Sequence, residues 1–175
     1  KIGIKYLSAW GFSTENWGRN ELEKNFLFKV FLKLVEDCEA DLHKEKIRFF
    51  HVGRKDRIPK KLAEKIGKLE KETKNYSGFN LVFCLDYGGR DEIVRAVNNA
   101  IESGKKLDEK VFMNFLDTSG IPEPELVIRT GGEMRLSGFM PFQTTYSELF
   151  FSEKFFPEPQ ALGGHFQKLV VFQKI

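Results

Sequence analysis

The chain has 175 residues, a length typical of one domain. Hydrophobic residues make up 41% of it and 18 positions are phenylalanine, which is enough for one core and excludes general disorder. Acidic and basic residues are mixed along the chain and leave a net charge of +3, too even a balance for a protein that coats nucleic acid. The longest apolar runs, such as Leu81–Leu85, are far shorter than the ~20 residues of a membrane span.

The cysteine content points to a reducing compartment. Cys38 and Cys84 both lie in apolar stretches without the spacing of a zinc site, so we expect two reduced core thiols and a cytoplasmic protein. The chain opens on Lys1-Ile2-Gly3-Ile4 with no initiator methionine and no signal-peptide pattern, and we expect the natural protein to start earlier.

Short β-like runs alternate with longer helical patterns along the whole chain. The predicted strands are Ile2–Ala9, Ile47–Val52, Phe79–Leu85, Leu126–Thr130 and Glu148–Phe151, and the predicted helices are Glu21–Lys46, Lys60–Lys74 and Asp91–Ser103. Such alternation indicates an α/β fold: a single domain with a mostly parallel central β-sheet flanked by helices. Ligands of such sheets bind beyond the carboxyl ends of the strands, so the loops of interest are 11–20, 53–58, 86–91 and 130–143.

The helix predicted over Glu21–Lys46 carries more apolar side chains than one buried stripe requires. It is either packed on two sides within the core or it also lines a tunnel for an isoprenoid or acyl chain. Composition does not choose between the two. Phe26, Val30, Phe31 and Leu34 are candidates for the floor of such a tunnel.

The loop after the first strand contains several donors that could meet an anion, with a tryptophan able to cover it. These residues lie between Gly11 and Arg19. The alternative interpretation is a turn in which Ser13 or Asn16 caps the following helix, and for an isolated stretch that alternative is favoured.

A glycine pair, Gly88-Gly89, joins the third predicted strand to its helix. Two glycines let the backbone approach a partner closely, but the sequence around them matches neither GxGxxG nor the GxxxxGK[ST] phosphate loop. Tight packing of the junction, with Asp91 and Glu92 at the helix start, is the simpler interpretation.

The richest segment runs from Arg129 to Phe139. Arg129 and Arg135 flank the pair Gly131-Gly132 at the end of an apolar strand, and such a fork can hold a diphosphate through bidentate hydrogen bonds. Surface ion pairs are the alternative, which we disfavour because a guanidinium directly after Leu126-Val127-Ile128 needs a partner. Glu148 could supply an oxygen to Mg²⁺, which takes one or two carboxylates together with ligand phosphates.

Three ordered segments of the chain resemble motifs of the cis-prenyltransferases, the family of undecaprenyl diphosphate synthase. They are Phe12–Trp17, Tyr87–Arg90, and Arg129–Arg135 with Gln143–Leu149. The resemblance covers about Ile2 to Glu158. It implies an enzyme that condenses isopentenyl diphosphate repeatedly onto an allylic diphosphate, such as farnesyl or geranylgeranyl diphosphate, with cis geometry, to make a long-chain polyprenyl diphosphate. It also implies Mg²⁺, a homodimer, and a place in the cytoplasm, peripheral at the membrane face.

The same resemblance implies roles for individual residues. Isopentenyl diphosphate would be held by Arg129, Arg135, Leu136 and Ser137, and Glu148 would belong to the Mg²⁺ site. The substrate loop would be lined by Ser13, Thr14, Glu15, Trp17 and Arg19. Asn16 would be the candidate catalytic residue, where the family handles a proton. Since a neutral amide is a poor base, we expect Asn16 to orient a phosphate or a water.

The chain also departs from the family pattern. An Asp-Gly-Asn-Gly-Arg loop should lie before Lys1, and without its aspartate we expect the 175 residues to bind isopentenyl diphosphate weakly and not to turn over. Gly53-Arg54 stands in place of Gly-Asp, and Gly138 replaces a common asparagine. We therefore predict a cis-prenyltransferase-like domain over 1–158 and a divergent tail over 159–175.

Two other functions are open from the sequence. A non-catalytic partner subunit of a cis-prenyltransferase would also lack the aspartate, although it has no reason to keep the other motif residues. An unrelated α/β domain for a phosphate-bearing ligand is less favoured, because neither usual phosphate loop is present.

Overall fold

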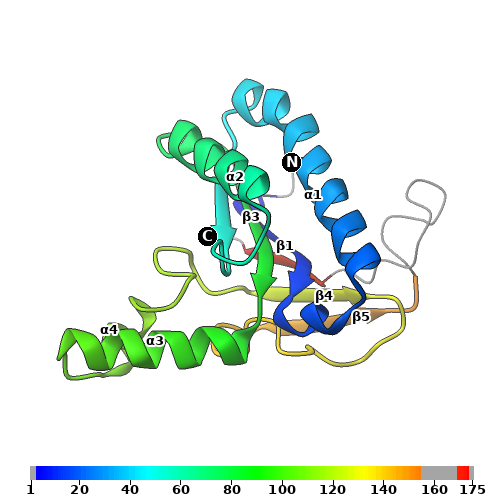
Figure 1. The fold of residues 1–175 in the computed structure, drawn as a ribbon. Helices are drawn as coiled ribbons and strands as arrows, with labels where there is room; N and C mark the ends of the chain where they lie inside the picture. The colour runs from blue at the N-terminus through cyan, green and yellow to red at the C-terminus, as the bar shows by residue number, and fades with distance from the viewer. Residues whose placement is uncertain (1–2, 155–168, 174–175) are drawn as a thin grey trace.

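The computed structural model describes residues 3–154 and 169–173, and these form one six-stranded sheet with helices packed around it (Figure 1). The strands are β1 (Tyr6–Ser13), β2 (Arg48–Val52), β3 (Asn80–Tyr87), β4 (Leu126–Thr130), β5 (Glu148–Ser152) and β6 (Leu169–Gln173). The helices are α1 (Glu21–Lys44), α2 (Lys60–Thr73), α3 (Gly89–Ser103) and α4 (Glu109–Met113), with a 3-10 turn, η1 (Thr14–Gly18), after β1. The predicted α/β fold is confirmed.

The sheet has the order β2-β3-β1-β6-β4-β5. β1, β3 and β2 pair in parallel, as do β4 and β5, whereas β6 pairs antiparallel with both β1 and β4. All strands except β6 therefore run in the same direction, and their carboxyl ends lie at one edge of the sheet. The expectation of a mostly parallel sheet is correct. The strand over Leu169–Gln173 was not predicted; the division at Glu158 stays a prediction, because 155–168 lie outside the described residues.

β1 is the one strand whose predicted position is clearly shifted. It continues through Gly11 to Ser13, four residues beyond the predicted end, and its register with β3 shifts between Trp10 and Phe12. Gly11 permits this irregularity, because a Cβ there would lie 3.0 Å from the Phe83 ring and 3.1 Å from Phe31. A glycine that indicated a loop thus marks a bulge within a strand.

The core has two parts, one on each face of β3. Phe83 and Leu85 face a cluster that α1 and α2 cover, which includes Phe12, Phe28, Phe31, Leu62, Ile66 and Leu69. Val82 and Cys84 face the second cluster, which includes Tyr87, Ile121, Val127, Phe139 and Met140. β3 is buried on both faces, as expected for a central parallel strand. Cys38 and Cys84 are both free thiols, as predicted.

α1 divides its apolar side chains between the core and the surface. Leu27, Phe28, Phe31 and Val35 are buried, whereas Leu22, Phe26 and Leu34 are exposed. Of the four tunnel candidates, Phe31 is a core residue, while Phe26 is 62% exposed and Leu34 is 47% exposed. None of the helices in the described part of the chain is long and apolar enough to cross a bilayer.

Candidate active site

The carboxyl edge of the sheet gathers residues from all three motif segments. Ser13 ends β1 and leads into η1, Tyr87 ends β3 and is followed by Gly88-Gly89, and Thr130 ends β4 ahead of the loop 131–140. This is the edge at which ligands bind in parallel α/β sheets.

η1 is held by its own side chains and does not cap α1. The Oδ1 atom of Asn16 accepts a hydrogen bond from the Ser13 backbone N–H at 2.9 Å. The α1 N-terminus is capped instead by Asn20, whose Oδ1 accepts from Glu23 N–H at 2.9 Å. The capping alternative is therefore correct for the turn, because Ser13 is the N-cap residue of η1 and Asn16 accepts from its N–H, but it does not apply to α1, which Asn20 caps. The amide nitrogen of Asn16 is the group that can donate to a ligand.

The other residues predicted for this loop differ in exposure. Thr14 is half-buried, and Glu15 and Arg19 are exposed, with Arg19 only 3.7 Å from Glu23 in a surface ion pair. Trp17 is half-buried, and its ring packs against Phe12 and Phe28. The tryptophan thus anchors the turn to the core.

Gly88 and Gly89 bring η1 and the loop 131–140 to the same place. A Cβ on Gly88 would lie 2.0 Å from Thr14 Oγ1, and a Cβ on Gly89 would lie 2.0 Å from Pro141 Cδ. The Gly89 N–H also donates to the Gly138 carbonyl at 2.9 Å. The glycine pair therefore has a reason beyond helix initiation: two chain segments approach it closely.

Arg129 holds the loop 131–140 in shape. Its side chain is almost fully buried and donates from Nη1 to Ser137 Oγ at 2.8 Å and to the Arg135 carbonyl. Burial lowers the pKa of this guanidinium, and the nearby Arg135 adds to the effect. Gly131, Gly132, Ser137 and Gly138 all have positive φ, so the loop has a backbone that few sequences adopt.

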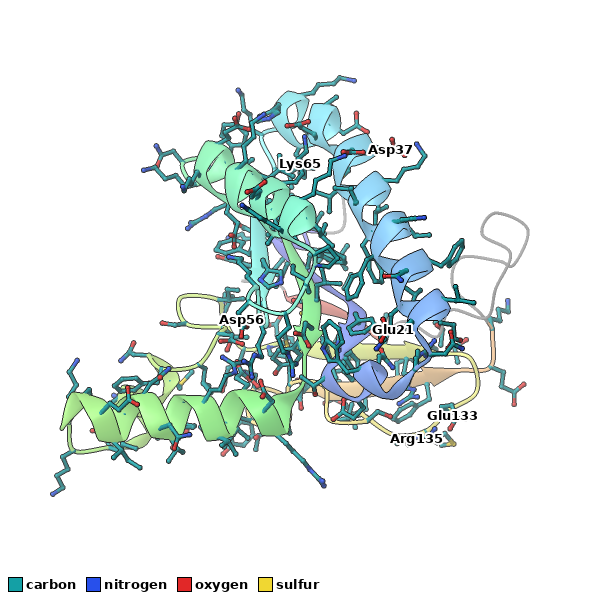
Figure 2. All side chains as sticks on the ribbon, viewed as in Figure 1. Glu21, Asp37, Asp56, Lys65, Glu133 and Arg135 are labelled. Atoms are coloured by element: carbon teal, nitrogen blue, oxygen red, sulfur yellow. The ribbon has the colours of Figure 1, made fainter. Side chains whose placement is uncertain are left out.

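Arg135 presents its guanidinium at the surface of this loop. Its side chain is 62% exposed and forms an ion pair with Glu133, and both are labelled in Figure 2. Leu136 is half-buried beside the second core cluster. Arg129, Arg135 and Ser137 are thus brought together as predicted, with Arg129 inside the loop and Arg135 outside it.

Glu148 does not lie beside the group formed by Arg129, Arg135 and Ser137. It is the first residue of β5 and pairs with Leu126, whereas Arg129 pairs with Phe151. At ~3.3 Å per residue, three positions along parallel strands place Glu148 about 10 Å back from Arg129, toward the amino edge. A carboxylate suits Mg²⁺ by its chemistry, but the described residues of one chain do not place this one beside the arginine loop.

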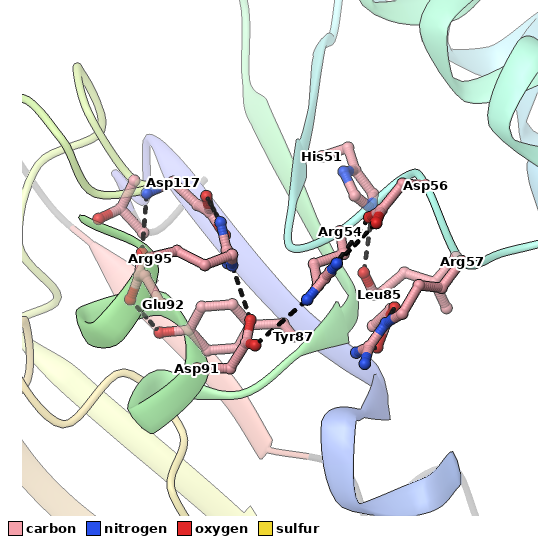
Figure 3. A network of polar contacts seen from close by, with 12 residues as sticks. His51, Arg54, Asp56, Arg57, Leu85, Tyr87, Asp91, Glu92, Arg95 and Asp117 are labelled. Atoms are coloured by element: carbon pink, nitrogen blue, oxygen red, sulfur yellow. Dashed lines mark hydrogen bonds and ion pairs between the residues drawn. The ribbon is translucent and has the colours of Figure 1, made fainter. Parts of the chain in front are cut away.

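A network of charged side chains, which the sequence did not predict as a network, lies along the same edge (Figure 3). Arg54 contacts Asp56 and Asp91, and Arg95 contacts Asp91 and Asp117. Glu92 accepts from Tyr87 Oη at 2.7 Å and from the Asp117 N–H at 2.9 Å, and burial raises its pKa. Asp86 also belongs to this network. In the sequence, a carboxylate at the end of an otherwise apolar strand is the signal that could have indicated Asp86.

The one cluster of potential metal ligands found in the described part of the chain lies elsewhere. Glu39 and His43 on α1 and Glu72 on α2 have ligand atoms within 4.8 Å of one another. Lys65 and Lys68 already contact these carboxylates, so lysine charge satisfies them. We assign no metal to this cluster.

Comparison with known proteins agrees with this geometry. A family model described as "Putative undecaprenyl diphosphate synthase" matches residues 1–171. An isoprenyl transferase of Fusobacterium nucleatum is 46% identical over 159 residues, which cover 90% of this chain and 69% of that protein. An isoprenyl transferase of Thermotoga maritima is 40% identical over 163 residues, covering 90% and 70%.

Solved structures give the same answer at the level of the fold. A probable undecaprenyl diphosphate synthase from Campylobacter jejuni superposes with a TM-score of 0.81 at 33% identity, covering 86% of this chain and 71% of that one. Lavandulyl diphosphate synthase from Lavandula x intermedia, solved with dimethylallyl diphosphate, has a TM-score of 0.81 at 31% identity, covering 87% and 69%. The chain belongs to the undecaprenyl diphosphate synthase family of prenyltransferases.

Proposed function

We propose that this protein condenses isopentenyl diphosphate onto an allylic diphosphate with cis geometry, making a long-chain polyprenyl diphosphate. The observation that supports it most directly is the meeting of η1 and the loop 131–140 across Gly88-Gly89. One segment offers the Asn16 amide and the other offers the Arg135 guanidinium, so a substrate between them meets donors from both sides.

The arginines have separate tasks in this proposal. Arg135 is exposed and, within the described part of the chain, forms an ion pair with Glu133 on the same loop, so a diphosphate can replace that carboxylate as its partner. Arg129 keeps the loop closed through Ser137 and the Arg135 carbonyl. The diphosphate that Arg135 would hold stays on the product, because it belongs to isopentenyl diphosphate. Charge builds up instead on the diphosphate that leaves the allylic substrate, where fixed donors such as the Asn16 amide stabilise it because they need no reorganisation.

In this proposal Asn16 orients a phosphate or a water and does not act as a base. Its Oδ1 is engaged by the Ser13 N–H, which leaves the amide nitrogen to donate to a phosphate oxygen or a water. The proton lost on condensation would then pass to the phosphate oxygen or the water that Asn16 orients, because a neutral amide does not accept a proton at neutral pH.

Magnesium, a homodimer and a cytoplasmic location at the membrane face belong to the same proposal. Mg²⁺ would supply further charge neutralisation on the diphosphates; Glu148 is the ligand that the family resemblance implies, although it lies about 10 Å from Arg129 along the strands. The exposed apolar side chains Tyr146, Leu149 and Phe150, on and beside β5, suit a subunit contact. Sedimentation at micromolar concentration tests the dimer.

The test of function is turnover by the natural full-length protein. Labelled isopentenyl diphosphate with farnesyl diphosphate and Mg²⁺ should give polyprenyl products with cis double bonds. No product from the protein alone, with product only after a second subunit is added, would favour the partner-subunit alternative.

A further inference from the structure

Asp86, at the end of β3, is a buried carboxylate whose oxygens accept three side-chain hydrogen bonds. Its side chain is fully buried, and its backbone has a φ of +52°, a value that is unusual for a residue other than glycine. Oδ1 and Oδ2 accept from Arg57 Nη2 at 2.5 Å and Nε at 2.8 Å, which is a bidentate pair. Oδ1 also accepts from the indole N–H of Trp17 at 2.7 Å.

These contacts join three loops at the carboxyl edge. β2, β3 and β1 are neighbours in the sheet, so the loops that follow them lie next to one another. Arg57 lies in the loop after β2, and the backbone N–H of Arg54 in that loop donates to the Asp86 carbonyl at 3.1 Å. Trp17 lies in η1 after β1. The loop after β2 therefore fixes Asp86 through Arg57 and Arg54, and Asp86 in turn fixes η1 through Trp17.

Trp17 transmits this constraint to the turn because its ring is fixed on several sides. Phe12 and Phe28 pack against it with centroid distances of 5.5 and 5.6 Å. The Arg57 guanidinium lies 5.4 Å from the ring centroid, and the Lys24 ammonium lies 5.5 Å from it. Asn16, which precedes Trp17 in the five-residue turn, has little freedom while the indole N–H stays on Asp86.

We propose that Asp86, fixed by Arg57, is a positioning residue of the prenyltransferase site, which holds Trp17 and so sets the conformation in which η1 presents Asn16 to the substrate diphosphate. The strained backbone at Asp86 fits this role, since such backbone conformations cluster at functional sites. The inference rests on the function proposed above, and it adds to that function two residues, Asp86 and Arg57, that act through Trp17.

Asp86→Asn is the direct test, because it keeps the shape and removes the charge that pairs with Arg57. The indole N–H resonance of Trp17, assigned with Trp17→Phe, should move in the variant. Affinity for isopentenyl diphosphate, measured by calorimetry, should fall at least about tenfold. In turnover assays of the full-length protein, kcat should fall more than any loss of stability explains.

Asp56→Asn is the matched control. It also breaks a bidentate arginine–aspartate pair, with Arg54 in the same loop, but Asp56 is exposed and does not touch Trp17. It should leave the Trp17 resonance and the affinity near those of the unmodified protein. Combining Asp86→Asn with Arg57→Gln removes the unpaired charge but does not restore the constraint on Trp17, so the affinity should stay low; recovery of the affinity would show that the unpaired Arg57 charge caused the loss and would overturn the positioning role. If Asp86→Asn does not fold, Arg57→Lys keeps a charge without the fork and should give a smaller change in the same direction.

The outcomes separate the inference from the proposed function. If the unmodified protein does not bind isopentenyl diphosphate, the proposed site is wrong and the inference fails with it. If the unmodified protein binds it and Asp86→Asn binds it equally well, the site stands and the positioning role is overturned. An unmoved Trp17 resonance overturns it as well.

Discussion

Arg129 and Arg135 are six positions apart, yet their environments give them different physical roles. Arg129 is 5% exposed and its hydrogen bonds close the loop, whereas Arg135 stands 62% exposed on that loop. Removing Arg129 takes the donor away from Ser137 Oγ and the Arg135 carbonyl, which fix the shape of the loop, whereas removing Arg135 takes the ion-pair partner away from Glu133.

This difference predicts opposite patterns for the two alanine variants. Arg135→Ala should keep the melting temperature and weaken use of isopentenyl diphosphate at least about tenfold, because a charge-assisted contact contributes roughly 1.5–3 kcal/mol. Arg129→Ala should lower the melting temperature and weaken substrate use as well, because the loop loses its shape. Lysine at either position should restore only part of the function. Melting curves and steady-state kinetics on the same samples check this, and normal substrate use by Arg135→Ala would contradict the diphosphate role.

His51 shows how the burial of a titratable side chain makes stability depend on pH. It is buried on β2, its Nε2 lies 3.0 Å from the Leu85 carbonyl, and burial, followed by the charge of Lys55, lowers its pKa to about 4. In the unfolded chain its pKa is about 6.5, so between these values the unfolded state binds the extra proton. Stability should therefore be complete above pH ~6.5 and fall as pH drops toward 4, by up to about 3 kcal/mol. Denaturant titrations at pH 7 and 4.5 measure it. The loss should shrink in His51→Gln and persist in His43→Gln, whose side chain is 35% exposed.

At the scale of elements, periodicity predicted most of the fold. α1, α2 and α3 begin within two residues of their predicted positions, and β2–β5 do so as well, because each is read from a local pattern of apolar residues. The sequence also did not predict α4, a helix of five residues, and the other failures depend on contacts distant in sequence. Gly11 suggested a loop because its packing against Phe83 and Phe31 is not visible locally. The strand β6 was missed because its partners, β1 and β4, lie far away along the chain.

Site residues that belong to a local sequence motif were predictable, whereas residues that only the fold brings to the site were not. Ser13, Asn16, Arg129, Arg135 and Ser137 are local to two segments, and both segments reach the carboxyl edge. Residues that only tertiary contacts recruit, such as Asp86 and Arg57, carry no such pattern in the sequence.

α1 offers a prediction that separates core from tunnel. Phe31→Ala should cost about 3–5 kcal/mol of unfolding free energy, because Phe31 is 4% exposed and packs against Phe83 at 5.8 Å between ring centroids. Phe26→Ala and Leu34→Ala should leave stability within about 0.5 kcal/mol. If either exposed residue floors a tunnel in the complete enzyme, its alanine variant should give longer products. Product analysis by chromatography decides, and unchanged lengths across the alanine variants of all four candidates, Val30 and Phe31 included, would place the tunnel elsewhere.

At the scale of the whole molecule, the sheet order sets the distance between the two halves of the site. β6 separates β1 from β4, so the ends of those strands lie about 10 Å apart, two strand spacings. The loop 131–140 spans this distance and meets the start of α3 at Gly89. The site is thus assembled across the sheet, and Gly89 lies where its parts are in contact.

Substitution of Gly89 should therefore disturb both stability and binding. Alanine would normally favour a helix start, but here its Cβ would lie 2.0 Å from Pro141 Cδ and 2.7 Å from the Gly138 carbonyl oxygen, which is backbone and cannot rotate away. We expect Gly89→Ala to cost about 1–3 kcal/mol through overpacking and to weaken isopentenyl diphosphate binding by displacing the arginine loop. Gly67→Ala is the control: nothing lies within 4 Å of its Cβ position in α2, so it should stabilise the protein by about 0.5–1 kcal/mol and leave binding unchanged. Denaturant melts and calorimetry on both variants make the comparison. A Gly89→Ala protein with unaltered stability and affinity would show that the loop 131–140 can move away from α3 without consequence.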